Sequence, residues 1–338
     1  MAEELSFPTG IGTSDADHIR LLGQDLAADL MGKVGFGELA FWLVAGRRPS
    51  PGETRVFEAV LVALADHGFT PTAIAARVTY ASAPEALQGA LAAGLLGGGS
   101  RFLGVTEDVG RFLSAYIGQI NKYPEMDAEW DEIATRAVSE TKRIPGLGHP
   151  VHKVQDPRTP VLIRIAEEEG LRGPHLRLFE AIGRVHPAIL GKTLPLNGAG
   201  VCGAALADLG LPVEMLRGFA LLARAAGLLG HLAEERRTNL GLEIYRTVDR
   251  NAVYRRRRRG HHRRGDRVDA PSVLLQGQHV DRRGPPAVRR RVGGQDPALP
   301  RDADQGRARR AGDGRLGPLP PAVAGQHAAV PGRQGADV

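Results

Sequence analysis

The chain has 338 residues, with 44 Lys and Arg against 38 Asp and Glu and a net charge of +6. Its single cysteine excludes an internal disulfide and fits a reducing compartment. No apolar run reaches the roughly 20 residues of a membrane span, and the first residues lack a basic-then-apolar signal pattern, so we expect a cytoplasmic protein without membrane contact.

Helix signals dominate the first 254 residues. A capping sequence at Ser14–Asp17 predicts a helix from there to about Lys33, with one apolar stripe. The stripe consists of Ile19, Leu22, Leu26 and Leu30. Ser50–Glu53 has the pattern of a capping box with proline at the first helical position. Further helices are predicted at 37–45, 53–67, 71–80, 84–96, 105–120, 127–143, 157–169, 174–185 and 212–229. Few runs alternate with period two, so the fold is predicted to be all-α.

The chain changes character after Tyr254. Residues 255–338 contain 19 Arg, no Lys, 8 Asp and no Glu, a net of +11, which leaves −5 for residues 1–254. Apart from Ser272, every residue type in this tail has a codon that begins with G or C, as expected when GC-rich DNA is read out of frame. We therefore hypothesise a native domain at 1–254 and an out-of-frame, low-complexity tail at 255–338. Without large apolar residues, the tail is expected to be disordered.

A basic tail that binds nucleic acid is the alternative reading. Arg255–Arg259 and Arg289–Arg291 are dense positive runs of the kind that bind phosphates. No aromatic residues interleave them for base stacking, so nucleic acid is disfavoured as a partner. Sequencing the gene separates the two hypotheses, since an intact frame through the junction contradicts out-of-frame translation.

The segment Ile144–Arg158 (IPGLGHPVHKVQDPR) is the most informative in the chain. It combines two glycines, three prolines, two histidines and a lysine. Asp156 is a good N-cap and Pro157 fits the first helical position, which places Arg158 at a helix N-terminus. Backbone N–H groups there favour an anion. The segment therefore predicts a site for a multiply anionic, carbonyl-bearing substrate.

This segment resembles the histidine loop of the citrate synthase superfamily, where Gly-x-Gly-His is followed by a basic residue and Asp-Pro-Arg. Four other stretches follow in the family's order and approximate spacing: Ala65–Gly68, Leu95–Ser100, Leu194–Gly200 and Ala223–His231. The resemblance covers about residues 35–250. The short length looks more like citryl-CoA lyases, and the citrate synthase-like C-terminal part of ATP-citrate lyase, than full-length citrate synthases. It implies a multi-helix fold with a large and a small lobe, usually as a homodimer.

The resemblance also assigns roles to single residues. His149 matches the catalytic histidine that acts on the hydroxyl/carbonyl oxygen, and an imidazole that titrates near neutral pH suits this proton transfer. Arg158 matches an arginine that binds a substrate carboxylate, which a guanidinium grips bidentately. The structural alternative for Arg158 is an ion pair with Glu167 or Glu168.

Further binding residues are implied with less support from the motifs. His67 matches a substrate-binding histidine at a helix C-terminus, where the helix dipole also favours His⁺. Arg224 matches another carboxylate-binding arginine and lies in an apolar helix, where an unpaired charge is costly without a bound anion. Arg237 is a candidate for the last anion contact. His152 and Lys153 are candidates for binding the CoA phosphates.

Two positions depart from the family pattern. Gly97 falls where the family has its enol-stabilising histidine, a loss that ATP-citrate lyase-like modules share. Ala199 falls at the position of the carboxylate base, and alanine cannot take a proton. Asp208, nine residues on, is interpreted as structural, and Asn197 is no base.

Three weaker signals are rejected. Gly198–Gly203 has the spacing of a dinucleotide fingerprint but lacks a preceding strand and a later acidic residue. Gly191–Thr193 resembles the end of a phosphate loop without its first glycine. His149, His152 and Asp156 do not have a standard metal-site spacing, so no metal is predicted.

The sequence thus predicts an enzyme, a CoA-thioester carbon–carbon lyase or acyltransferase without a bound cofactor. The expected reaction is reversible cleavage of citryl-CoA, or a similar hydroxyacyl-CoA, to acetyl-CoA and a keto acid such as oxaloacetate. Cleavage suits Ala199 better than synthesis, because cleavage starts at a hydroxyl group whereas synthesis removes a weakly acidic α-proton. The alternative, suggested by Gly97 and Ala199, is a CoA-ester-binding homologue without turnover.

Overall fold

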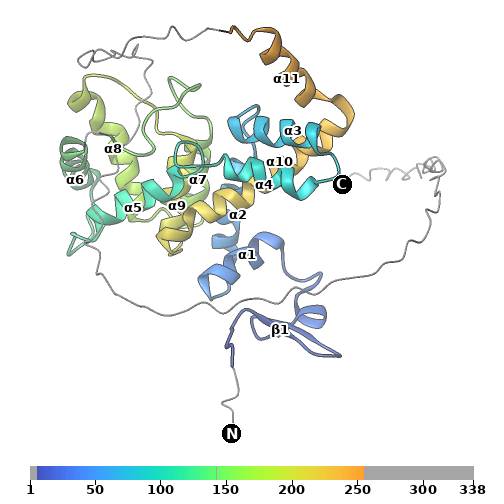
Figure 1. Ribbon diagram of the computed structural model, residues 1–338. Helices are drawn as coiled ribbons and strands as arrows, with labels where there is room; N and C mark the ends of the chain where they lie inside the picture. The colour runs from blue at the N-terminus through green and yellow to red at the C-terminus, as the bar shows by residue number, and fades with distance from the viewer. Residues whose placement is uncertain (1–5, 142, 255–338) are drawn as a thin grey trace, which may run out of the picture. The chain divides into compact units, whose positions relative to one another are not determined.

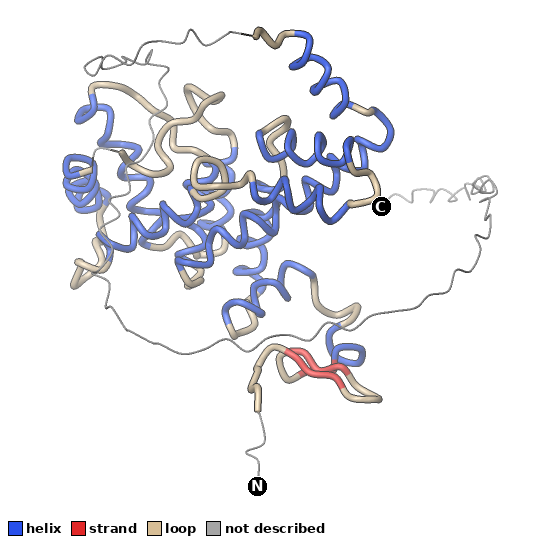
Figure 2. The backbone as a smooth tube through the Cα atoms, in the orientation of Figure 1, coloured by secondary structure: helices blue, strands red, loops and turns tan. Residues whose placement is uncertain are grey.

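A short antiparallel sheet precedes a helical body in the computed structural model, which describes residues 6–141 and 143–254 (Figures 1 and 2). These residues belong to one unit, Met1–Arg258. The prediction of a mostly helical fold is confirmed. The predicted tail at 255–338 lies outside the described residues, so the hypotheses about it remain predictions.

The elements of the helical body agree in most places with the sequence. The helices are α1 (Phe36–Ala45), α2 (Pro51–Ala65), α3 (Pro71–Ser82), α4 (Leu87–Leu96), α5 (Val105–Ile117), α6 (Asp127–Glu140), α7 (Arg158–Glu168), α8 (Pro174–Leu190), α9 (Gly198–Asp208), the 3₁₀ turn η2 (Val213–Met215), α10 (Leu216–Thr238) and α11 (Leu240–Arg250). The predicted capping box is present: the Glu53 amide donates to the Ser50 side chain, and the Ser50 amide donates to Glu53.

The predicted helix at 14–33 is wrong. The segment instead forms β1 (Gly12–Ser14), β2 (Ile19–Leu21), β3 (Gln24–Asp25) and a π-helical turn, η1 (Leu26–Leu30). Leu22 and Gly23 both have positive φ, 54° and 77°, and make the two-residue turn between β2 and β3. That turn geometry matches the twist of paired strands. Local turn chemistry therefore overrides a helical spacing of apolar residues.

The prediction lacks two of these helices, α9 and α11, and ends α8 and α10 several residues too early. The segment that forms α9 is rich in glycine and alanine and almost fully buried, so it has no polar face to reveal a helical period. The N-cap of α11 is Asn239, which lies in the left-handed region and makes no side-chain capping hydrogen bond. α8 continues through Pro187 to Leu190, and α10 extends nine residues past the predicted end at Leu229.

The core consists of two hydrophobic clusters that share α10. The large cluster draws on α1, α2 and α5–α10, and the small one lies between α3, α4 and the second half of α10. Ala223 belongs to the large cluster and Leu228 to the small one, so Arg224 lies near the boundary between them. α10 packs on α2, α3 and α4, as can be followed in Figure 1.

Across the part of the chain that the structure describes, no helix has the length and apolar character that crossing a bilayer requires.

Candidate active site

The histidine loop, residues 146–158, is fixed by backbone pairing to the strand-like segment before α9. Gly146 and Gly148 adopt φ values of 78° and 89°, which glycine tolerates and other residues rarely adopt. The Gly148 amide donates to the Pro195 carbonyl (2.7 Å), and the Asn197 amide donates to the Gly146 carbonyl (2.9 Å). The Asn197 side chain also donates to the Gly148 carbonyl (2.8 Å). The next residue, His149, is therefore held next to the start of α9.

His149 is fixed in one tautomer by its own loop. Its Nδ1 accepts hydrogen bonds from the amides of Val151 (3.1 Å) and His152 (2.9 Å). A neutral imidazole carries one proton, so that proton must lie on Nε2. Burial lowers the pKa of His149, and the nearby His152 and His67 act in the same direction, against the opposing influence of Asp156. His149 is thus a neutral hydrogen-bond donor through Nε2.

Arg158 is neutralised by Asp156, which is fully buried. Its Nε and Nη2 donate to the two carboxylate oxygens of Asp156 at 3.0 and 2.7 Å, rather than to Glu167 or Glu168. The Gly198 amide donates to the same carboxylate (2.7 Å). Burial alone would raise the pKa of Asp156, but these hydrogen bonds outweigh it and hold that pKa far below its ordinary value.

The C-terminal end of α2 organises the opposite side of the site. The Ala63 carbonyl accepts from Arg158 Nη1 (3.1 Å), and the Leu64 carbonyl accepts from Arg224 Nη2 (3.3 Å). The last carbonyls of a helix lack partners within it and carry partial negative charge, so both guanidinium groups are favoured there. Gly227 allows α10 to approach, since a Cβ at this position would lie 2.0 Å from the Ala65 carbonyl oxygen.

Arg224 has no acidic partner among the described residues. It is 5% exposed, and its Nη1 donates to the hydroxyls of Thr70 and Thr72, both at 3.2 Å. Its Nε has no hydrogen-bond partner within residues 6–141 and 143–254. Burial lowers the pKa of Arg224, which reflects the cost of holding this charge away from water. The predicted unpaired arginine in an apolar helix is therefore present.

These side chains meet at one cavity of about 340 Å³. It is lined by Leu64, His67, Phe69, Thr70, Pro71, Arg101, Phe102, Leu103, Val105, His149, Pro150, Val151, Arg158, Asn197, Ala199 and Arg224. The lining joins the α2–α3 connection, the α4–α5 connection, the histidine loop, the start of α9 and the middle of α10. Both basic and apolar side chains line it, which suits a ligand with anionic and apolar parts.

The cavity brings together His67, His149, Arg158 and Arg224, four residues singled out by the sequence, and Ala199 lies in its wall. Other sequence candidates lie elsewhere. Arg237 is exposed in the last turn of α10. Gly97 caps α4 outside the lining, and Lys153 is exposed with its Nζ donating to the His149 carbonyl (3.1 Å).

Sequence reasoning missed several lining residues. From the α4–α5 connection it considered Gly97, whereas the side chains that reach the cavity are those of Arg101 and Phe102. Phe69 and Thr70 were also missed, although both follow directly after the Asp-His-Gly motif. Closeness to a recognised motif was the available signal.

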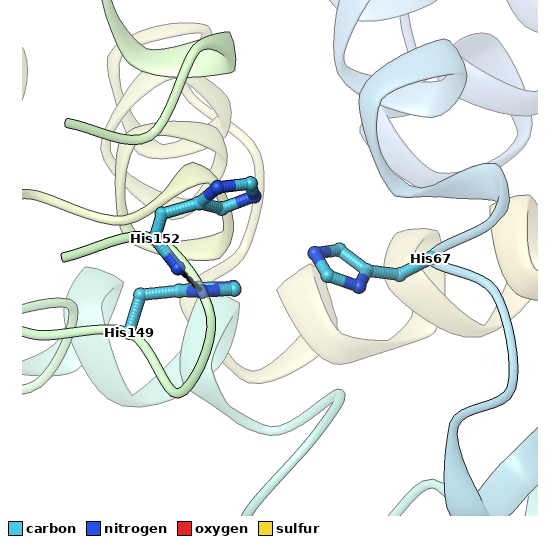
Figure 3. Close-up of side chains that lie close together, drawn as sticks. All are labelled: His67, His149 and His152. Carbon is cyan, nitrogen blue, oxygen red and sulfur yellow. Dashed lines mark hydrogen bonds between the residues drawn. The ribbon is translucent and has the colours of Figure 1, made fainter.

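Three imidazoles lie close together, as Figure 3 shows: His67 from the α2–α3 connection faces His149 and His152 from the histidine loop. His67 and His149 line the cavity, whereas His152 is not part of its lining. One ring nitrogen from each lies within 4.8 Å of the others. The rings of His149 and His152 are stacked, with centroids 4.5 Å apart and planes at 28°. Nδ1 of His149 is already used by two amides, and Arg158 and Arg224 add positive charge beside the cluster. This arrangement disfavours a metal cation.

The fold and the cavity together define a mostly helical protein with a cavity lined by several basic side chains. Residues 17–247 match the family model described as "Citrate synthase, C-terminal domain". That match spans most of the chain, so the chain belongs to the citrate synthase family, as the sequence motifs predicted.

Two solved structures share the fold of this chain. Citryl-CoA lyase from Hydrogenobacter thermophilus is 30% identical, with a TM-score of 0.66, and the alignment covers 75% of this chain and 96% of that one. ATP citrate lyase from Methanosaeta concilii, solved with (3S)-citryl-CoA, is 24% identical with a TM-score of 0.62, and 43% of it is covered. At that identity the second comparison shows the shared fold alone.

Curated relatives include the citrate synthases of Deinococcus radiodurans, 30% identical over 227 residues, and of Synechocystis, 26% identical over 226 residues. The alignments cover 64% and 63% of this chain and 56% and 52% of the relatives. The chain thus spans about half the length of these curated relatives. It is related to enzymes that act on CoA thioesters.

Proposed function

We propose that the chain cleaves citryl-CoA, or a similar 3-hydroxy-3-carboxyacyl-CoA, reversibly to acetyl-CoA and a keto acid such as oxaloacetate. The observation that carries the proposal is Arg224, a buried guanidinium that has no acidic partner among the described residues and faces the same cavity as His67 and His149. A substrate carboxylate would supply the missing partner. The near-complete coverage of a citryl-CoA lyase supports cleavage as the reaction class.

In this proposal the substrate is held by groups on opposite sides of the cavity. His149 donates from Nε2 to the hydroxyl oxygen, which becomes the keto oxygen as the carbon–carbon bond breaks. Arg224 and Arg158 hold carboxylates, although Asp156 already occupies one face of Arg158. Phe102 and Val105 give the thioester an apolar wall.

Contacts outside the cavity belong to the same proposal. His152, which is half-buried, and Lys153, which is exposed, are neighbours in the histidine loop and are proposed to bind the CoA phosphates. Arg237, exposed at the end of α10, is proposed to contribute an anion contact in a homodimer, the assembly that the family resemblance implies.

The direct test uses the purified protein with citryl-CoA and a small panel of acyl-CoA thioesters, each with and without keto acids. Chromatography of the CoA species follows cleavage and condensation separately. We expect citryl-CoA cleavage to exceed condensation. Equal efficiency in both directions would contradict the preference for cleavage, and failure to convert any thioester would contradict catalysis.

The second candidate is a CoA-ester-binding homologue without turnover. It is favoured by Ala199, whose methyl group lies in the cavity wall at the family's carboxylate position. This candidate predicts micromolar binding of citryl-CoA by calorimetry with no product. Ala199→Asp would then restore turnover, whereas turnover by the unaltered protein would reject this candidate.

A further inference from the structure

The described lining of the cavity contains few groups that can accept a proton. Its ionisable side chains are His67, His149, Arg101, Arg158 and Arg224. Arginine stays protonated in proteins, so the three guanidinium groups are not bases. Thr70 and Asn197 also line the cavity, but neither a hydroxyl nor an amide takes a proton near neutral pH.

His149 is also excluded as the acceptor. Its only free nitrogen toward a ligand is Nε2, and Nε2 carries the proton of the neutral ring, because Nδ1 accepts from two amides. A proton on Nδ1 would point at the N–H groups of Val151 and His152 and replace two hydrogen bonds with repulsion. His149 can therefore donate a hydrogen bond to the substrate oxygen but cannot accept the hydroxyl proton.

Two carboxylates near the site, Asp66 and Asp156, accept hydrogen bonds from other protein groups and do not line the cavity. Asp66 accepts from the Gly68 amide (2.8 Å) and pairs with His231 Nε2 (2.9 Å). Burial raises the pKa of Asp66, but these hydrogen bonds outweigh it and lower that pKa overall. Asp156 is held by Arg158 and the Gly198 amide.

His67 is the remaining group, and its position suits an acceptor. Its half-buried ring makes no hydrogen bond to the described residues. The ring centroid lies 5.2 Å from that of His149, and a ring nitrogen of each lies within 4.8 Å of the other. Two nitrogens that share one tetrahedral oxygen, each at about 2.8 Å, are about 4.6 Å apart. The spacing of the two rings is thus compatible with one substrate oxygen placed between them.

The segment that carries His67 is anchored through its neighbours rather than through its ring. Arg77, which is fully buried, donates from Nε to Nδ1 of His231 (3.0 Å), so the far nitrogen of His231 donates to Asp66. Asp66 precedes His67, and its side chain closes the turn at Gly68. His67 is thus placed by its backbone, and its nitrogens stay available to a ligand.

We propose that His67 is the catalytic base that compensates for Ala199 in the cleavage reaction proposed above, on which this inference rests. The neutral imidazole takes the proton of the tertiary hydroxyl, and the O–H electron pair becomes the C=O bond of the keto acid. The bond between the carbinol carbon and the thioester CH₂ breaks, and its electron pair forms the enolate. The imidazolium of His67 then gives its proton to the former CH₂ carbon of the enolate, which yields acetyl-CoA.

This sequence needs no external acid or base, because one proton leaves oxygen and returns to carbon. The hydroxyl oxygen and the CH₂ carbon are bonded to the same carbon, so a single imidazole reaches both. His149 donates to the oxygen throughout and keeps its proton. A carboxylate at position 199 is then dispensable for cleavage.

The test measures citryl-CoA binding by calorimetry and its cleavage by steady-state kinetics for the full chain and for His67→Ala. We expect kcat to fall at least about 100-fold, the usual contribution of general base catalysis, with KM changed less than about threefold. Added imidazole should restore turnover, increasingly so as pH rises and more of it is neutral. His18→Ala, which removes an exposed imidazole from the β1–β2 connection, is the matched control.

Each outcome decides between the ideas. Absence of cleavage by the unaltered protein overturns the proposed function and the role of His67 together. If the unaltered protein cleaves citryl-CoA but His67→Ala has an unchanged kcat, only the role of His67 is overturned. The same holds if His67→Ala raises KM alone and added imidazole does not reverse the change. If His67→Ala does not fold, His67→Gln replaces it, and the unaltered protein's kcat should rise with pH to a plateau; a flat profile contradicts the proposal.

Discussion

The two sides of the cavity differ in how far the protein satisfies their polar groups. On the loop side, His149, Arg158 and Asn197 each use hydrogen bonds within the protein to fix their orientation. On the helix side, neither Nε of Arg224 nor the ring of His67 makes a hydrogen bond to any residue that the structure describes. A buried polar group without a partner is costly, so the helix side is where a ligand gains most.

This difference distinguishes charges that stabilise the fold from charges that bind a ligand. The Asp156–Arg158 pair is a closed unit, in which each charge has its partner within the protein, so its removal should mainly lower stability. Arg224 is an open unit, without an acidic partner among the described residues, so its removal should mainly weaken ligand binding. The cavity therefore combines a rigid frame with unmet hydrogen-bonding capacity, and substitutions on each side test the distinction.

The largest effect is expected on the loop side, for Asp156→Asn. The substitution leaves the Arg158 guanidinium partly buried without a compensating charge, so we expect unfolding free energy to fall by about 3–5 kcal/mol. Denaturant titration followed by circular dichroism measures it. The matched control is Asp131→Asn, which breaks the more exposed pair with Arg184 and should cost under about 1 kcal/mol. Equal losses for the two variants would contradict the closed-unit interpretation.

On the helix side, Arg224→Met is expected to act in the opposite way. It removes a buried charge that has no acidic partner among the described residues, so stability should be unchanged or higher. Affinity for citryl-CoA should fall about 10- to 150-fold, the range for losing hydrogen bonds to a charged group. Calorimetry and thermal unfolding of the same samples give both quantities. Arg164→Met, on the exposed face of α7, is the control. A large loss of stability with unchanged binding would reverse the assignment.

The sequence predicted the loop side well because its signals are local. Glycines at 146 and 148, prolines and the Asp-Pro-Arg sequence each restrict the backbone directly, and their order along the chain carries the family resemblance. α7 nevertheless begins one residue later than predicted, with Pro157 rather than Asp156 at the N-cap position. Most helix positions in the body followed from spacing and caps. The segment at 14–33 failed because the turn at Leu22 and Gly23 outweighs apolar spacing.

Other features depend on contacts between distant segments and were not predictable. The tautomer of His149 follows from the path of the loop around its own ring. Arg101 and Phe102 line the cavity because of how α4 and α5 are connected in space, not because of a motif. The glycine spacing in α9, rejected above as a dinucleotide fingerprint, gives no sign in the sequence that Gly203 lets α9 approach Thr106 of α5.

A smaller effect is expected at Gly198, which lies against the Arg158 side chain. A Cβ here would lie 2.2 Å from Nε of Arg158, so Gly198→Ala must displace the guanidinium from Asp156. We expect a loss of about 1–3 kcal/mol in unfolding free energy, typical of overpacking. Gly230→Ala, in α10 with open space around the new methyl group, is the control and should stabilise by up to about 1 kcal/mol. Equal effects at both positions would show that Arg158 does not depend on this close approach.

The smallest effect concerns the pH dependence of stability through His149. Because burial lowers its pKa in the folded protein, the unfolded chain binds a proton first as pH falls below about 6.5. His149 therefore contributes stability that is complete above that pH and is lost as pH falls toward the folded pKa.

His149→Asn keeps an acceptor near Nδ1 for the two loop amides but does not titrate. Thermal unfolding of both proteins between pH 8 and pH 5 should show the native protein losing stability more steeply below about pH 6.5, with a difference that grows as pH falls. Parallel curves would mean that His149 takes up its proton equally well in the folded state. The ring would then be free to turn Nδ1–H away from the amides of Val151 and His152, and the loop side would lose the fixed donor that distinguishes it from the helix side.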